Sequence, residues 1–197
     1  NQQFSSGYSE RQVKVARVSI ATKLRDRFGS DKIILGNVNW GKDKATAHFL
    51  NGVFLELYKE PYNSSANRLY NSNELTKIEK LLEFYEANLA APKLIALEGW
   101  RKTAKSFKKV GYNYRDDRNS PQNRKMAKLL TAMSVVVPTN GYILYGDNNP
   151  DTPNGDHGHN YYDFYSFDIG KPTGPRVKVS NGISYKQHQE GFIAYNI

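Results

Sequence analysis

The chain has 197 residues, of which 39% are hydrophobic, so it can bury one good core and length favours one domain, or two at most. It has no cysteine, which excludes disulfides, cysteine nucleophiles and thiolate metal sites. The net charge of +9 favours polyanions such as nucleic acid or acidic glycans, but the basic residues are scattered and no nucleic-acid fold signature accompanies them. We therefore expect a basic solvated surface, and we do not expect nucleic acid as a partner.

The start of the chain bears on processing and on membranes. The first residue is Asn1 rather than methionine, so we expect a processed product or a fragment. No apolar run is long enough to span a bilayer and no signal peptide opens the chain, so no membrane span is expected. Phosphate-binding and dinucleotide-binding glycine motifs are absent too, and we expect no cofactor.

Helix and strand patterns alternate from the first element onward. Apolar residues at helical spacing predict a helix from Ser9 to Phe28, which Gly29 ends. A short buried strand is predicted at Lys32–Asn37, and Asp43–Phe49 is expected to form a short helical turn. The apolar run Gly52–Tyr58, entered from a glycine and bounded by turn signals, predicts the second strand.

The middle of the chain continues this alternation. Asn73 is expected to cap a helix that runs to about Leu89, and Leu94–Glu98 is expected to be the third strand. Ser120 and Pro121 begin another predicted helix, because proline is well placed in a first turn. The fourth strand is expected over residues 141–147.

The last part of the chain changes character. Residues 161–168 and 176–179 are predicted to be extended, around a turn at residues 170–172. Residues 183–187 and 192–195 are predicted to form a hairpin. We therefore expect four β/α units in residues 1–160 and C-terminal β segments in residues 161–197, packed on the same domain.

Strands that alternate with helices predict an α/β fold of parallel units with right-handed crossovers. Each predicted strand ends in a polar residue followed by a loop: Asn37, Glu56, Glu98 and Asp147. In an α/β barrel the carboxyl ends of the strands carry the active site, so these residues would meet at one mouth. Four units make half of such a barrel. Either the other half lies upstream or in a partner chain, or the sheet is open and doubly wound.

The tail carries a family resemblance. In residues 162–175 an aromatic and acidic segment leads into the turn Asp168-Ile169-Gly170-Lys171-Pro172-Thr173-Gly174. This segment resembles the closing part of glycoside-hydrolase-like α/β-barrel proteins, and Gln189–Asn196 is similar to the strand that follows in them. Gly52–Glu56 and Leu144–Asp147 resemble two of their barrel strands. The resemblance covers most of the chain but only the later half of the family's barrel. It implies that the four strands are the fifth to eighth of a TIM-type barrel.

The resemblance implies action on a polysaccharide, in an extracellular or cell-surface setting. Glycoside cleavage generally needs two carboxyl groups beside the scissile bond, and Glu56 and Glu98 can form such a pair, with Asp147 as a third candidate. Related barrels often place the nucleophile on the fourth strand, upstream of this chain, so Glu56 is the candidate general acid or base. The alternatives are a buried structural acid paired with Lys or Arg for Glu56, and an ion pair or substrate contact for Glu98, beside Trp100 and Arg101.

Polar and aromatic residues near the strand ends are candidates for binding sugar rings by hydrogen bonding and stacking. They are Asn37, Trp40, Tyr58, Trp100, Arg101 and Tyr145. The alternative for the aromatic rings is that they pack loops against the barrel rim. The loop 147–159 is dense in oxygen ligands but fails the EF-hand spacing, and its pair His157 and His159 supplies only two ligands, so no metal site is expected.

Two hypotheses from different classes follow. One is a carboxylate acid/base glycoside hydrolase, and the other is a non-catalytic structural or carbohydrate-binding component of a surface or particle assembly on the same scaffold. An acid at the end of the upstream fourth strand would favour the enzyme. Binding of a polyanion through the basic surface is a third, weaker hypothesis.

Overall fold

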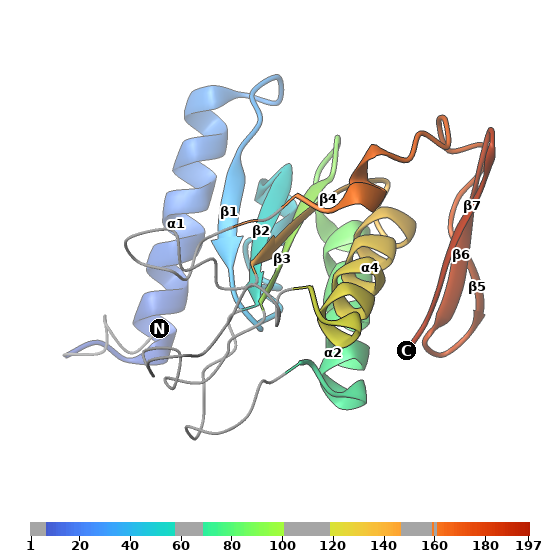
Figure 1. The fold of residues 1–197 in the computed structure, drawn as a ribbon. Coiled ribbons are helices and arrows are strands. Elements are labelled where there is room, and N and C mark those ends of the chain that lie inside the picture. Colours follow the sequence, from blue (N-terminus) through green and yellow to red (C-terminus); the bar gives the residue numbers. More distant parts are fainter. Residues whose placement is uncertain (1–6, 58–68, 101–118, 147–158, 160) are drawn as a thin grey trace.

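The structure is a computed structural model, which describes residues 7–57, 69–100, 119–146, 159 and 161–197 (Figure 1). Tyr58, Arg101 and Asp147 lie outside the described residues. The described chain forms a four-stranded parallel sheet with alternating helices, followed by a three-stranded antiparallel sheet. The predicted α/β class with parallel strand–helix units is therefore confirmed.

The parallel sheet contains β1 (Leu35–Val38), β2 (Gly52–Leu57), β3 (Leu94–Trp100) and β4 (Asn140–Gly146), in the order β1-β2-β3-β4. Strand order therefore follows chain order. A doubly wound sheet reverses its strand order at a switch point, and the described strands contain no such reversal. The described strands do not close into a barrel either, and β1 and β4 are the edges of this sheet.

Helices α2 (Ser72–Asn88) and α4 (Pro121–Val136) lie on the same side of the sheet (Figure 1). The core between the helices and the sheet includes Ile78, Leu82, Leu130 and Met133 from the helices and Val53, Leu55, Ile95 and Leu97 from the strands. Because side chains alternate along a strand, the residues between these apolar positions point to the opposite face. Glu56 and Glu98 belong to that opposite face.

Local capping residues explain where α2 and α4 begin. Helix α4 begins at Ser120-Pro121 as predicted, and Ser120 is its cap, because its side chain accepts a hydrogen bond from the backbone of Asn123. The cap of α2 is Asn71, two residues before the predicted Asn73. Asn71 and Glu74 form a reciprocal capping box, which needs an acid or amide at the third helical position. That requirement selects Asn71.

Helix α1 (Glu10–Phe28) is confirmed as a helix, but its apolar residues are not its main attachment to the fold. Ile20 and Phe28 are 59% and 49% exposed, and Ala21 is the buried residue of the helix. Arg25 instead fastens α1 by donating hydrogen bonds to the carbonyl of Phe49 and to the side chain of Asn51. In the described part of the chain, neither α1 nor any other helix is long and apolar enough to cross a membrane.

The C-terminal sheet contains β5 (Val177–Ser180), β6 (Ile183–His188) and β7 (Gly191–Asn196), all antiparallel. The hairpin β6–β7 and the extended segment at β5 confirm two predictions. The prediction of extended structure over residues 161–168 is wrong in its centre, because Asp163–Ser166 is a 3-10 helix, η4. Asp163 accepts a hydrogen bond from the backbone of Phe164, and Ser166 donates one to the carbonyl of Asp163, so local polar bonds favour a turn.

Arg176 joins this C-terminal sheet to α2. Its guanidinium donates to Glu79 Oε1 at 2.5 Å, to Glu83 Oε1 at 2.7 Å and to the Tyr195 hydroxyl at 2.8 Å. Tyr195 in turn donates to Glu79, which is buried, and both burial and this bond raise the pKa of Tyr195. A buried carboxylate needs such partners, so these residues fix the small sheet against the helix.

Candidate functional site

Glu56 on β2 and Glu98 on β3 occupy paired positions in the sheet. In-register residues on neighbouring parallel strands share a face and lie roughly 4.8 Å apart at the backbone. Both residues are close to the carboxyl ends of their strands, since β2 ends at Leu57 and β3 at Trp100. The structure thus brings together two of the three candidate acids, and the third, Asp147, lies outside the described residues.

Asn37, a candidate substrate-binding residue, lies beside Glu56. Its side-chain amide donates a hydrogen bond of 3.1 Å to Glu56 Oε2 from the neighbouring strand β1. Asn37 is exposed and Glu56 is half-buried. The amide therefore orients one carboxylate oxygen of Glu56 and leaves the group within reach of solvent.

Glu98 has a different environment, because its side chain is only 1% exposed. Its Oε1 lies 2.8 Å from Nε2 of His159. His159 is held in place by an antiparallel bridge between its backbone and that of Gly146, the last residue of β4. The sequence suggested His159 only as a metal ligand next to His157, which lies outside the described residues. Glu98 and His159 are 61 positions apart in the sequence, and no spacing rule links them.

Asn37, Glu56, Glu98 and His159 form a row that we call the acid row. It runs from β1 across β2 and β3 to the end of β4. Each of the two acids contacts a side-chain nitrogen: Glu56 accepts from the amide of Asn37, and Glu98 contacts the imidazole of His159. Two carboxyl groups in unlike surroundings can take different roles in acid–base chemistry, one transferring a proton and the other remaining charged.

Tyr70 fixes the strand ends next to the acid row. Its hydroxyl donates to the carbonyl of Leu57 at 2.8 Å and accepts from the backbone N–H of Trp100 at 2.7 Å. Tyr70 is 4% exposed. It lies between β2 and α2, where the sequence predicted neither a helix nor a strand, and this role was missed because its partners are backbone groups, which no sequence pattern identifies.

The candidate sugar-stacking rings have different surroundings. Trp100 and Tyr145 are each 1% exposed, so neither presents an open ring face in this structure. The Tyr145 hydroxyl donates to the buried side chain of Asn123 at 2.7 Å, which places it in a polar contact beneath α4. Trp40 is half-buried, 5.9 Å from the ring of Tyr70, with the Lys77 ammonium 5.0 Å above its own ring.

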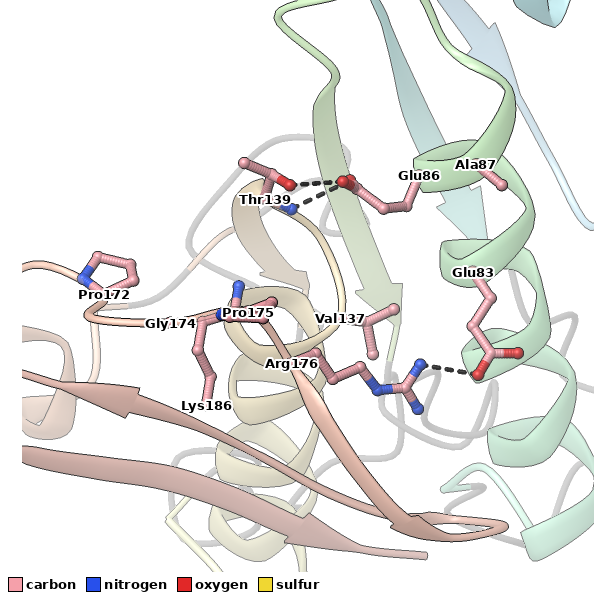
Figure 2. Close-up of a pocket in the computed structure, with 10 residues that line it drawn as sticks. All are labelled: Glu83, Glu86, Ala87, Val137, Thr139, Pro172, Gly174, Pro175, Arg176 and Lys186. Atoms are coloured by element: carbon pink, nitrogen blue, oxygen red, sulfur yellow. Dashed lines mark hydrogen bonds and ion pairs between the residues drawn. The ribbon is translucent and has the colours of Figure 1, made fainter.

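A cavity of about 540 Å³ lies at the other end of the strands, between α2, the turn before β4 and residues 172–176 (Figure 2). Its charged side chains already serve the fold. Glu86 accepts hydrogen bonds from Thr139, and Arg176 pairs with Glu83 (Figure 2). Lys186 donates to the carbonyls of Val135 and Pro138, and burial lowers its pKa. Because the charged residues that line this cavity bond to other parts of the fold, we take the acid row as the candidate site.

The described part of the chain contains no group of three or more His, Asp or Glu side chains that could hold a metal ion. No model of a known protein family matches this chain. No curated protein matches it either. The functional interpretation therefore depends on the chemistry of the acid row and on the resemblance found in the sequence.

Proposed function

We propose that this protein is a glycoside-hydrolase-like barrel protein that acts on a polysaccharide, with Glu56 and Glu98 as its carboxyl pair. The observation that carries the proposal is the register of these two residues at the carboxyl ends of neighbouring parallel strands. Most glycosidases place two carboxyl groups on either side of the scissile glycosidic bond. Strand ends of this kind are also where α/β barrels carry their active sites.

In this proposal Glu56 is the general acid and base, because it is the more accessible of the two acids. The Glu56 carboxyl gives its proton to the leaving glycosidic oxygen as the carbon–oxygen bond breaks. A water molecule then adds to the anomeric carbon and returns a proton to Glu56. Glu98 supplies negative charge that stabilises the oxocarbenium-like transition state. Asp147, Tyr58 and Arg101 remain candidates for further contacts with the acids or the sugar.

The scaffold in this proposal is the second half of a TIM-type barrel. Strand order that follows chain order and two helices on one side of the sheet support it. On the face of the sheet away from the helices, Leu35 on β1 and Tyr142 on β4 are 60% and 58% exposed. Both edge strands therefore expose apolar side chains that a further part of the barrel would bury. An upstream half of the same polypeptide, or a partner chain, would pair with these edges and enclose the acid row. A polysaccharide substrate implies an extracellular or cell-surface location.

The test is release of reducing sugar from a panel of polysaccharides by the full-length polypeptide. Glu56→Gln keeps the size of the side chain and the hydrogen bond from Asn37 but cannot transfer a proton. We expect release to fall by about 100-fold or more, the usual contribution of a general acid or base. Glu190→Gln, at an exposed hairpin position, is the matched control and should release sugar like the wild type.

Two outcomes would contradict the proposal in different ways. Equal release by wild type and Glu56→Gln would remove the role given to Glu56. No release by the wild type from any polysaccharide, together with direct binding of one of them, would overturn hydrolysis and support a non-catalytic carbohydrate-binding component.

A further inference from the structure

We propose that His159 is the positioning residue of the acid row, which holds the buried Glu98 carboxylate in one orientation through the contact between its imidazole and Glu98 Oε1. The inference rests on the proposed function for its catalytic consequence, but the pair itself can be measured without any substrate. The 2.8 Å contact between His159 Nε2 and Glu98 Oε1 carries it, together with the 1% exposure of Glu98. A carboxylate buried to this degree is stable only when it is hydrogen-bonded or paired with a charge.

Backbone pairing with the end of β4 places His159 next to Glu98. Gly146 pairs with His159 in an antiparallel bridge and is itself in register with Trp100 on β3. Trp100 lies two residues after Glu98 in the same strand, so its side chain shares the face of Glu98. The imidazole therefore reaches Glu98 from a segment that is hydrogen-bonded to the sheet, which favours a defined geometry.

The partners of the two acids differ in what they can supply. The amide of Asn37 can orient an oxygen of Glu56, but it carries no charge. The imidazole of His159 can donate a hydrogen bond and, when protonated, balance the charge of Glu98. Glu98 is in register with the acid Glu56, and the base His159 contacts its Oε1. The different partners and the greater exposure of Glu56 assign proton transfer to Glu56 and a fixed orientation to Glu98.

The first test needs no activity. In protein labelled with ¹⁵N-histidine, Glu98→Gln should move the Nε2 resonance of His159, because that nitrogen loses its carboxylate partner. Glu56→Gln should leave the resonance near its wild-type position, since Glu56 contacts Asn37 instead. His159→Asn assigns the signal among the four histidines of the chain. An unchanged Nε2 resonance in Glu98→Gln would overturn the proposal, whatever the enzyme does.

The second test uses sugar release. His159→Ala should lower kcat by at least about tenfold, as expected for loss of a group that orients a reacting residue, and change KM by less than about twofold. His159→Gln, whose amide can still donate a hydrogen bond, should recover part of kcat, which loss of folding would not allow. His48→Gln, at an exposed histidine, should behave like the wild type. An unchanged kcat in His159→Ala would overturn the positioning role.

The two tests also separate this inference from the proposed function. If the wild type releases no sugar while the His159 resonance still responds to Glu98→Gln, the pair is established and the proposed hydrolysis is wrong. If sugar is released but the resonance does not respond, the proposed function stands and the role of His159 is wrong.

Discussion

The backbone N–H of Trp100 donates a 2.7 Å hydrogen bond to the hydroxyl of Tyr70. The same hydroxyl donates to the carbonyl of Leu57, so one buried phenol joins the ends of β2 and β3, one residue after Glu56 and two residues after Glu98. Burial raises the pKa of Tyr70 far above its ordinary value, and the hydroxyl stays protonated at neutral pH. It can therefore donate and accept at once.

Tyr70→Phe removes this hydroxyl without removing the ring. We expect the free energy of unfolding to fall by about 1–3 kcal/mol, because two buried backbone groups lose a hydrogen-bond partner. Urea denaturation followed by far-UV circular dichroism measures the change. Tyr142→Phe is the matched control, since Tyr142 is 58% exposed and its loss should change the free energy by no more than about 0.5 kcal/mol. Equal stability of the two variants would contradict the role of Tyr70.

Loss of the Tyr145 hydroxyl is expected to lower the stability of the fold without changing the affinity for a glycan. Its hydroxyl donates to Asn123, which also donates to Tyr162 at 2.8 Å, and Tyr145 and Asn123 are buried. Tyr145→Phe should lower the free energy of unfolding by roughly 1 kcal/mol or more through the lost bond. The dissociation constant for a bound glycan should not change in a titration by calorimetry. Weaker glycan binding with unchanged stability would show that Tyr145 contacts the substrate.

Gly141 sits where β4 meets α4 too closely for any side chain. A Cβ atom built at this position lies 1.6 Å from the backbone oxygen of Ser134, so the strand or the helix has to move. We expect Gly141→Ala to cost about 1–3 kcal/mol of folding free energy by overpacking, measured as a lower denaturation midpoint. Gly191→Ala is the control, because a Cβ atom there has no neighbour within 4 Å. A Gly141→Ala protein as stable as this control would contradict the close packing.

Acid should weaken the attachment of the C-terminal sheet. Burial alone would raise the pKa of Glu83, but hydrogen bonds from Lys178 and Arg176 outweigh it and lower the pKa below 4.5. A carboxyl group whose pKa is lower in the folded state contributes stability above its unfolded pKa, and this contribution is lost as the pH falls through the folded pKa. Thermal unfolding midpoints of the wild type should therefore drop below about pH 4.5.

Glu83→Gln provides the comparison for this acid effect. It should lower the midpoint at pH 7, where the charged group contributes, and show a smaller drop on acidification than the wild type. The effect is expected to be small, because Glu83 is partly exposed and solvent screens its ion pairs. Parallel pH curves for the two proteins would show that Glu83 does not contribute in this way.

Local signals in the sequence were enough to predict the parallel sheet and the nearness of Glu56 and Glu98. The helix that begins at Ser120-Pro121 and the strand that starts at Leu94 are both determined by residues within a few positions. The nearness of the two acids follows from strand ends alone, because parallel strands present their carboxyl ends at one edge.

What the sequence did not predict depends on register and on distant partners. Tyr145 is in register with Gly99 and belongs to the face that the helices cover, whereas a shift of one residue would place it on the face of the acid row. The contact of Glu98 with His159 and that of Tyr70 with Trp100 join residues 61 and 30 positions apart. In each case the contact depends on tertiary packing, which no local pattern encodes.

The bond between Glu79 and Arg176 also has a consequence for the order in which the protein is made. Helix α2 carries Glu79, but Arg176 follows 97 residues later and Tyr195 follows 116 residues later. Translation is directional, so the ribosome completes the helix long before the groups that stabilise its buried acid exist. A nascent chain therefore cannot finish this packing until Arg176 and Tyr195 are synthesised, and a polypeptide that ends before Tyr195 keeps an incompletely satisfied carboxylate in its interior.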